Sequence, residues 1–328
     1  MKIGLLGCGR IGQVHAKSIA HLDGVEVSAV ADAFAAPAET LAASTGSVVL
    51  GSEALIQSAD VDAVVIGTPT DTHYDLIHQA AAAGKAIFCE KPVDMSADRI
   101  RDCMEAVAKA NVPFLTAFNR RFDPNFAHVQ SRIAAGDIGA VEIVTIQSRD
   151  PSPPPVSYIK SSGGLFRDMM IHDLDMARFL LGEEPTGVYA VGAALVDPVI
   201  GEAGDVDTAA VTLTTASRKI CQISNSRRAS YGYDQRIEVH GADGMLRAEN
   251  MLENTVQLAT SEGFRAAPAQ HFFLERYAEA YRREMAHFVS AVRDGTPVSP
   301  SIEDGLRAQV LADAAAESLE KGTPVEVS

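Results

Sequence analysis

The chain has 328 residues, of which 47% are hydrophobic and 22% charged, and its formal net charge at pH 7 is −15. This length and composition predict a soluble globular protein of about two domains. The acidic balance argues against nucleic acid and anionic membrane surfaces as partners, because both attract clustered lysine and arginine. No apolar stretch approaches the roughly 20 residues of a membrane-spanning helix, and no export signal is recognisable, so we expect a cytoplasmic protein.

Cysteine usage predicts neither a metal centre nor a disulfide framework. Cys8, Cys89, Cys103 and Cys221 lie far apart in the sequence and form no C-x-x-C pair. Zinc sites and disulfide-rich domains both need a characteristic cysteine spacing. We therefore expect four reduced packing residues and no bound metal.

The first 119 residues alternate between short apolar runs and helical segments. The expected strands are residues 2–6, 25–31, 47–50, 63–67, 86–89 and 114–117, and the expected helices are 11–19, 35–44, 52–58, 71–83 and 97–110. Near-continuous apolar strands separated by helices are typical of a parallel sheet that helices cover on both faces. An α/β domain is therefore expected over residues 1–119.

The pattern changes after about residue 119. A helix at 125–135 and a strand at 141–148 precede DPSPPP at 150–155, which is expected to be an exposed loop. Beyond it we expect a helix at 168–181, strands at 187–195, 207–215, 219–226, 235–241, 245–248 and 255–259, and helices at 271–294 and 302–321. Short strands separated by turn residues predict a second, α+β domain over residues 120–299, with a large open, mostly antiparallel sheet.

The segment GCGRIG, residues 7–12, matches G-x-G-x-x-G between an expected strand and an expected helix. Gly7 permits a tight turn, Gly9 lets the backbone approach a pyrophosphate, and Gly12 lets helix and strand pack closely. The helix N-terminus adds free N–H groups and a positive dipole. The motif predicts a Rossmann domain that binds a dinucleotide, and a tight turn without a ligand remains the alternative.

The second expected strand ends near Asp32, 20 residues after Gly12. A carboxylate at this place accepts hydrogen bonds from the adenosine ribose hydroxyls and repels a 2′-phosphate. NAD is therefore favoured over NADP. Arg10 in the glycine loop keeps NADP open as an alternative.

Two charged clusters follow that suit chemistry on a hydroxyl group. Glu90-Lys91-Pro92 follows the strand 86–89, at the carboxyl end of a parallel strand, where open α/β sheets bind ligands. A lysine ammonium there can donate to a hydroxyl or ketone oxygen, with Glu90 nearby to hold it. A surface ion pair is the alternative reading of the same residues.

The second cluster is Asp168 and His172, which are four residues apart and would share one face of a helix. A carboxylate beside an imidazole orients the ring and favours its protonated form, as a base that collects an alcohol proton requires. A solvated ion pair on a helix surface is the alternative.

Taken in order, GCGRIG, Asp32, Glu90-Lys91-Pro92 and the segment around Asp168 and His172 resemble the Gfo/Idh/MocA oxidoreductase family over essentially the whole chain. The resemblance is closest to its bacterial inositol dehydrogenases. It is carried there by NRRFD (119–123), SRDPSPPP (148–155), SGGLFRDMMIHDLDMARFL (162–180), YGYDQR (231–236) and RYAEAYRREMAHF (276–288).

The resemblance implies NAD-dependent oxidation of a cyclic polyol, with myo-inositol to 2-keto-myo-inositol the expected reaction. It implies a catalytic triad of Lys91, Asp168 and His172. The implied NAD-binding residues are Gly7, Gly9, Arg10, Ile11, Gly12, Asp32, Thr68, Pro69, Glu90 and Lys91. The implied substrate-binding residues are Lys91, Arg120, Asp150, Asp168, His172, Tyr233 and Tyr281.

The resemblance also implies a homotetramer whose subunits meet through the open sheet, and a C-terminal helix, about 300–328, that packs back on the nucleotide domain. Asp150 departs from relatives that carry an amide there. Two other functions stay open at this point. The chain is either a dehydrogenase of another inositol isomer or an aldose sugar, or a non-catalytic redox sensor that binds NAD.

Overall fold

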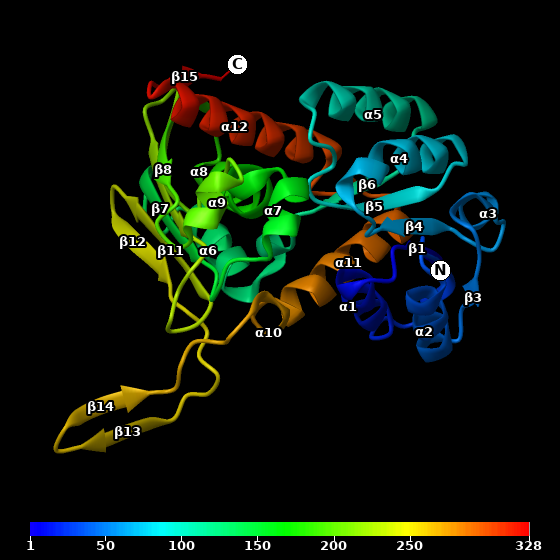
Figure 1. The fold of residues 1–328 in the computed structure, drawn as a ribbon, viewed down its shortest axis with the longest axis horizontal. Coiled ribbons are helices and arrows are strands. Elements are labelled where there is room, and N and C mark those ends of the chain that lie inside the picture. Colours follow the sequence, from blue (N-terminus) through cyan, green and yellow to red (C-terminus); the bar gives the residue numbers. More distant parts are fainter. Residues whose placement is uncertain (328) are drawn as a thin grey trace. The chain divides into compact units, whose positions relative to one another are not determined.

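The computed structural model describes residues 1–327. The chain divides into two compact units, one formed by Met1–Phe122 with Glu279–Gln309 and the other by Asp123–Ala278 with Val310–Ser328 (Figure 1). Among the helices of the described residues, none is both long enough and apolar enough to cross a membrane.

The first unit is built on a six-stranded parallel sheet in the order β3-β2-β1-β4-β5-β6. Its strands are β1 (Lys2–Leu6), β2 (Glu26–Ala31), β3 (Val48–Val49), β4 (Ala63–Ile66), β5 (Ala86–Glu90) and β6 (Phe114–Ala117). The strand order reverses between β1 and β4, the place at which sheets of this class bind ligands. This order confirms the predicted Rossmann fold.

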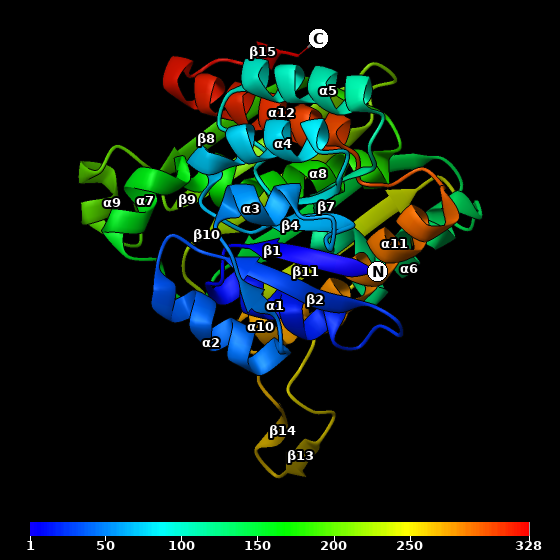
Figure 2. The same ribbon diagram turned by 90° about the vertical axis from the view of Figure 1, so that its right-hand side faces the viewer.

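Helices cover both faces of this sheet (Figure 2). They are α1 (Arg10–Ile19), α2 (Ala35–Thr45), α3 (Ser52–Gln57), α4 (His73–Ala82), α5 (Ala97–Ala110) and α11 (Ala278–Asp294). Side chains of α1, α2 and α11 enter one core cluster, whereas α4 packs against α3 and α5. The four-residue strands β4 and β6 are buried at every position, as expected for strands covered from both sides.

Helix α11 lies in the first unit, although we expected residues 120–299 to form the second domain. Met285, Phe288 and Val289 recur at helical spacing and are buried in the same core as the strands. The rings of Phe88 and Phe288 meet edge to face with centroids 5.6 Å apart. Burial of this apolar stripe, which no local signal assigns to either domain, determines where the helix belongs.

Helix α12 (Ile302–Lys321) is divided between the units after Gln309. In the first unit, Gly305 packs so closely that an added Cβ would lie 2.7 Å from the Val93 side chain. The Gln309 side-chain amide donates to the Met95 carbonyl at 3.3 Å. In the second unit, the Ser318 hydroxyl oxygen accepts a hydrogen bond from the Ala190 N–H at 3.0 Å.

The second unit contains a seven-stranded sheet in the order β12-β11-β7-β10-β9-β8-β15. Its strands are β7 (Val141–Arg149), β8 (Pro185–Ala193), β9 (Thr208–Thr215), β10 (Ile220–Ser226), β11 (Asp234–Gly241), β12 (Gly244–Ala248) and β15 (Val325–Glu326). Only β7 and β10 pair in parallel. The predicted mostly antiparallel sheet is confirmed.

One face of this sheet lies against helices and the other is open. Besides the C-terminal part of α12, the helices of the unit are α6 (Pro124–Ala134), α7 (Val156–Ser162), α8 (Ile171–Leu181), α9 (Pro198–Glu202) and α10 (Phe273–Arg276). Val144 and Ile146 of β7 are buried toward α8, whereas Ile143 on the opposite face is 40% exposed. This alternation with period 2 is what a sheet covered on a single side requires.

Short elements that were not predicted include α7, α9 and the strand β14 (Gly263–Ala266), which pairs with β13 (Gln257–Thr260) in an exposed hairpin (Figure 1). Each is too short for hydrophobic periodicity to reveal it. The predicted helix at 271–294 is interrupted at Tyr277 between α10 and α11. The predicted helix at 168–181 begins instead as a π-helical segment, Phe166–Met170, that continues into α8.

Candidate active site

The glycine loop of the first unit contains two kinds of glycine. Gly7 has φ +94°, and an added Cβ would lie 2.5 Å from the Gly67 carbonyl oxygen. A Cβ on Gly12 would lie 2.0 Å from the Gly7 carbonyl oxygen. A Cβ added to Gly9 would have no heavy atom of residues 1–327 within 4 Å, apart from the two chain neighbours and the backbone of the same helix. The fold itself requires Gly7 and Gly12, whereas Gly9 leaves open space beside the backbone.

Helix α1 begins directly after Gly9, and no side chain caps its N-terminus. Arg10 is exposed and Ile11 half-buried in its first turn. The first N–H groups of a helix and its dipole attract an anionic group, and a glycine with open space beside it lets that group approach. The loop therefore fits the pyrophosphate of a dinucleotide.

Asp32 follows β2 with both carboxylate oxygens held by the backbone. Oδ2 accepts the Cys8 N–H at 2.7 Å, and Oδ1 accepts the Phe34 N–H at 2.9 Å. A carboxylate has about four acceptor positions, so two remain for ribose hydroxyls. The position and negative charge of Asp32 fit NAD.

The loops that follow β4 and β5 are joined by a histidine that the sequence analysis missed. His73 is buried, with Nε2 2.9 Å from the Thr68 carbonyl oxygen and Nδ1 3.0 Å from the Pro92 carbonyl oxygen. Burial lowers the pKa of His73, and a neutral ring carries one N–H, which serves one carbonyl at a time. His73 thereby connects the Thr68-Pro69 turn to the Glu90-Lys91-Pro92 turn.

Glu90 pairs with a second histidine that the sequence analysis missed. Glu90 Oε1 lies 2.6 Å from Nε2 of His15, which is fully buried on α1. The His15 ring also makes T-shaped contacts with the rings of Phe88 and Tyr281, with centroids 4.8 and 6.0 Å away. The Glu90 carboxylate, next to Lys91 in the sequence, is thus held in place by a residue of α1, the helix that follows the glycine loop. The signal in the sequence was a histidine three residues after Gly12.

Three further residues of the predicted site lie in the first unit. Lys91 is half-buried just after β5. Arg120 lies in a 3₁₀ turn, Asn119–Phe122, and is 5% exposed. Tyr281 is on α11 and is 7% exposed. Arginine side chains are rarely buried to this extent, and tyrosine side chains are usually buried less completely.

In the second unit, Asp168 lies within the π-helical segment and His172 in the first turn of α8. The predicted pairing of these two residues assumed α-helical spacing between them. A π turn is wider than an α turn, and such segments are frequent at functional sites. Both side chains are partly exposed, as a ligand-contacting pair must be.

Asp168 has two partners that the sequence analysis did not identify. The Tyr158 hydroxyl donates to Oδ1 at 2.9 Å, and both terminal nitrogens of Arg227 lie 3.5 Å from Oδ2. Arg227 is 1% exposed. Inward and outward residues alternate along a strand. Continuing that alternation one residue past β10 places the Arg227 side chain inward, and this was the only signal in the sequence.

The remaining predicted residues of this unit are Asp150 and Tyr233. Asp150 follows β7, and its N–H donates to the Ser226 carbonyl at 3.0 Å. Burial and the Asp168 charge, with a smaller contribution from Asp150, raise the pKa of Tyr158. Tyr233 is 6% exposed and packs edge to face against Tyr277, with ring centroids 5.9 Å apart.

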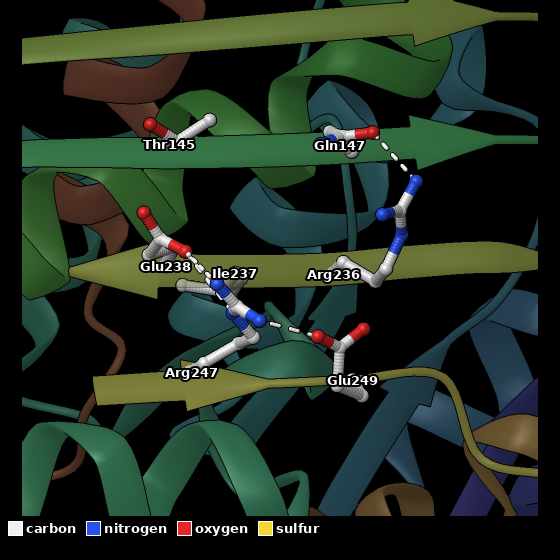
Figure 3. A pocket seen from close by; sticks show the side chains of 7 residues that line it. All are labelled: Thr145, Gln147, Arg236, Ile237, Glu238, Arg247 and Glu249. Carbon is white, nitrogen blue, oxygen red and sulfur yellow. Dashed lines mark hydrogen bonds and ion pairs between the residues drawn. The ribbon is translucent and has the colours of Figure 1, made fainter. Parts of the chain in front are cut away.

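A separate pocket of about 280 Å³ lies on the open sheet face, over β7, β11 and β12 (Figure 3). Its lining residues are Thr145, Gln147, Arg236, Ile237, Glu238, Arg247 and Glu249. Arg247 pairs with Glu238 at 2.9 Å and with Glu249 at 3.5 Å, and Arg236 donates to Gln147 at 2.6 Å. Because these charges neutralise one another and none belongs to the predicted site, we do not assign catalysis to this pocket.

Within residues 1–327, no three His, Cys, Asp or Glu side chains are arranged to hold a metal ion. The four cysteines are buried and free. Burial raises the pKa of Cys8 to about 11. A thiol with a raised pKa is a poor nucleophile at neutral pH, which agrees with a packing role.

Comparison with known proteins agrees with the geometry of each unit. The family model described as the NAD-binding Rossmann fold of the oxidoreductase family matches residues 1–118. The model described as the C-terminal alpha/beta domain of that family matches residues 130–327. Together they account for most of the chain.

Full-length relatives agree as well. The chain is 53% identical to an inositol 2-dehydrogenase of Rhizobium meliloti, covering 100% of this chain and 99% of the relative. A crystal structure of a myo-inositol dehydrogenase from Corynebacterium glutamicum is 43% identical, with a TM-score of 0.96 over 100% and 99% of the two chains. A scyllo-inositol dehydrogenase from Lactobacillus casei, solved with NAD(H) and scyllo-inositol, is 32% identical, with a TM-score of 0.93 over 99% and 98%. This chain therefore belongs to the Gfo/Idh/MocA family of NAD-binding oxidoreductases.

Proposed function

We propose that this chain oxidises myo-inositol to 2-keto-myo-inositol (scyllo-inosose) with NAD. The observation that carries the proposal is the 53% identity, over the full length, to the inositol 2-dehydrogenase of Rhizobium meliloti. In the reaction, one carbinol group loses a hydride and a proton and becomes a ketone. NAD, when bound, accepts the hydride.

The residues proposed to bind NAD surround the glycine loop and the ends of β4 and β5. They are Gly7, Gly9, Arg10, Ile11, Gly12, Asp32, Thr68, Pro69, Glu90 and Lys91. The open space beside Gly9, the uncapped start of α1 and the fixed carboxylate of Asp32 support this assignment. A carboxylate at Asp32 would repel the 2′-phosphate of NADP, which supports a preference for NAD.

The proposed catalytic residues are Lys91, Asp168 and His172. His172 takes the proton of the reacting hydroxyl, since imidazole exchanges protons near neutral pH. The Lys91 ammonium donates a hydrogen bond to the same oxygen as it becomes a carbonyl. Asp168 positions the imidazole and stabilises the positive charge that His172 gains.

The residues proposed to bind the polyol combine donors with acceptors. Besides the three catalytic groups they are Arg120, Asp150, Tyr233 and Tyr281. A ring with a hydroxyl on every carbon needs partners of both kinds. An apolar alcohol would leave these groups unpaired, and such discrimination reaches about 10⁴-fold. In this proposal, residues 1–119 serve NAD and residues 120–299 serve the substrate and subunit contacts, with Tyr281 contributed by α11.

A substrate panel tests the proposal. Purified protein is mixed with NAD or NADP and with inositol isomers, common aldoses or short-chain alcohols, and NADH or NADPH absorbance is followed. We expect turnover with myo-inositol and NAD, and none with short-chain alcohols. Good turnover only with an acyclic substrate, or none with any inositol or pyranose, would contradict the polyol assignment.

The same panel decides between the proposal and its alternatives. A scyllo-inositol preference is the second candidate, which the similarity to the Lactobacillus casei structure favours. It predicts a larger kcat/KM for scyllo-inositol than for myo-inositol. An aldose preference would show as turnover with a pyranose. A redox sensor would bind NAD, detectable by calorimetry, without oxidising any member of the panel.

We further propose that the chain works in the cytoplasm as a homotetramer whose subunits meet through the open sheet face of the second unit. Ile143, Tyr189, Val191 and Met245 lie on this face and are 40–48% exposed. The paired charges of the pocket in Figure 3 lie on the same face, and charges of both signs suit a surface that meets its own copy. Light scattering coupled to size-exclusion chromatography should give a mass near four times 34.7 kDa.

A further inference from the structure

We propose that Tyr158 and Arg227 are positioning residues that fix the Asp168 carboxylate, each holding a different oxygen. This inference rests on the proposed function, in which Asp168 is a catalytic residue. Neither residue belongs to the triad or to the substrate-binding residues proposed above.

The geometry divides the carboxylate between two different elements. Tyr158 is on α7 and donates to Oδ1 at 2.9 Å. Arg227 follows β10 and presents both terminal nitrogens to Oδ2 at 3.5 Å. Contacts to both oxygens restrict rotation about the Cβ–Cγ bond more than a contact to either oxygen alone. Two partners on opposite oxygens define its plane, so the remaining lone pairs point in fixed directions.

Arg227 is itself held firmly. Its backbone N–H donates to the Asp207 backbone carbonyl at 2.8 Å. A second carboxylate faces it, because Asp205 Oδ2 lies 3.9 Å from a terminal nitrogen, while Asp205 Oδ1 accepts the Leu165 N–H at 3.0 Å. The guanidinium side chain is 1% exposed, and a buried cation persists only when anions pair with it. Its contact with Asp168 is therefore part of what keeps Arg227 inside the protein.

Tyr158 supplies a donor that does not change with working pH. Burial, then the Asp168 charge and hydrogen bond, raise the pKa of Tyr158. The phenol consequently stays protonated and keeps donating throughout the range in which a histidine base operates. Tyr158 as a whole is 48% exposed, although its hydroxyl contacts Asp168 beside the buried Arg227, so replacing it with phenylalanine removes one oxygen and disturbs little packing.

Positioning of this kind predicts a specific kinetic signature. If both residues act through Asp168, Tyr158→Phe and Arg227→Lys should each lower kcat about 10-fold, with the KM for NAD unchanged. In an Asp168→Asn background, the same substitutions should cost no further activity, since the group they orient is gone. If their role were purely structural, their activity losses would instead multiply with the loss caused by Asp168→Asn.

Tyr231→Phe is the matched control. Tyr231 is 51% exposed, and its hydroxyl donates to another carboxylate of the same unit, Asp234, at 2.6 Å. Tyr231→Phe removes a tyrosine hydroxyl oxygen from a tyrosine–aspartate hydrogen bond, as Tyr158→Phe does, and should leave kcat unchanged. Activities are measured with myo-inositol and NAD, at enzyme concentrations raised in proportion for the slow variants.

The outcomes separate this inference from the function on which it rests. Wild-type turnover in Asp168→Asn would overturn the inference and the catalytic role of Asp168, while the proposed oxidation of myo-inositol would stand. Absence of turnover with every inositol and pyranose in the unsubstituted protein would contradict the proposed function itself. Loss of turnover in Asp168→Asn, with normal turnover in Tyr158→Phe and Arg227→Lys, would overturn the inference alone. Losses that multiply in the double variants would overturn it too. If Arg227→Lys fails to fold, Tyr158→Phe decides on its own.

Discussion

At the scale of single residues, the three glycines of GCGRIG differ in what they tolerate. Gly12 has the Gly7 carbonyl oxygen 2.0 Å from where a Cβ would stand, whereas the space beside Gly9 is open. The fold accounts for the glycine at position 12, and the proposed NAD site accounts for the glycine at position 9.

Gly9→Ala should therefore fold normally and bind NAD about 10-fold or more weakly, because the methyl group occupies space needed by the pyrophosphate. Gly12→Ala should be unstable, with overpacking against backbone costing roughly 1–3 kcal/mol or more. Thermal unfolding and calorimetric NAD titration measure the two effects. Unchanged NAD affinity in Gly9→Ala would show that the cofactor does not approach this glycine.

Asp32→Ser should narrow the preference for NAD over NADP. The substitution removes the negative charge that opposes a 2′-phosphate but keeps a hydroxyl near the ribose. The ratio of kcat/KM values for the two cofactors is the measurement. A wild-type enzyme that already prefers NADP would contradict the role given to Asp32.

His172→Ala should lower kcat on the order of 10² to 10⁴-fold, the usual contribution of a positioned acid or base. NAD affinity should change little, because no role in cofactor binding is proposed for His172. Steady-state kinetics and NAD titration of the same preparation separate the two quantities. Turnover close to wild type would remove His172 from the mechanism.

At the scale of elements, one buried carboxylate anchors the turn between β8 and α9. Asp207 accepts hydrogen bonds from the N–H groups of Leu195, Val196 and Asp197 at 2.8–2.9 Å. Burial alone would raise the pKa of Asp207, but these bonds outweigh it and the pKa is lowered. A carboxylate that is more acidic in the folded protein than in the unfolded chain stabilises the fold when it is ionised.

The sign of this effect gives a pH prediction. The contribution of Asp207 should be fully present above the unfolded pKa of about 3.9 and should be lost as pH falls through the lower, folded value. Asp207→Asn should reduce the free energy of unfolding at pH 7 by about 1–3 kcal/mol, and the difference from wild type should shrink below about pH 4. Urea denaturation between pH 7 and pH 3 measures both. A difference independent of pH would contradict the charge argument.

At the scale of the whole molecule, the open face of the seven-stranded sheet determines the proposed assembly. Val191 is 48% exposed on β8 and faces away from the helices of its unit. Val191→Glu should reduce the mass measured by light scattering, because a carboxylate would be desolvated at a subunit contact. Val199→Glu, at a 44% exposed position on α9 outside the sheet, is the control and should leave the mass unchanged. A tetramer retained in Val191→Glu would argue against this face.

Most of the helices and strands, and the cofactor motif, follow from the order of the amino acids alone. The helices 97–110 and 302–321 and the strand 114–117 have the bounds that periodicity predicts. These are local properties, since apolar spacing, turn residues and a glycine loop act over a few neighbouring positions. The proposed pairing of Asp168 with His172 uses the same kind of local spacing, but it assumed an α-helix where the chain forms the π-helical segment Phe166–Met170.

Contacts between distant residues follow only from the folded chain. Folding placed α11 in the core of the first unit, paired His15 with Glu90, and brought Tyr158 and Arg227 to Asp168. It also replaced an expected α-helical turn by a π turn at Phe166–Met170. Arg227 is 59 residues from Asp168 in the chain, and no pattern in the sequence couples them. Such contacts depend on the balance of burial and pairing across the whole unit, which no short stretch of sequence contains.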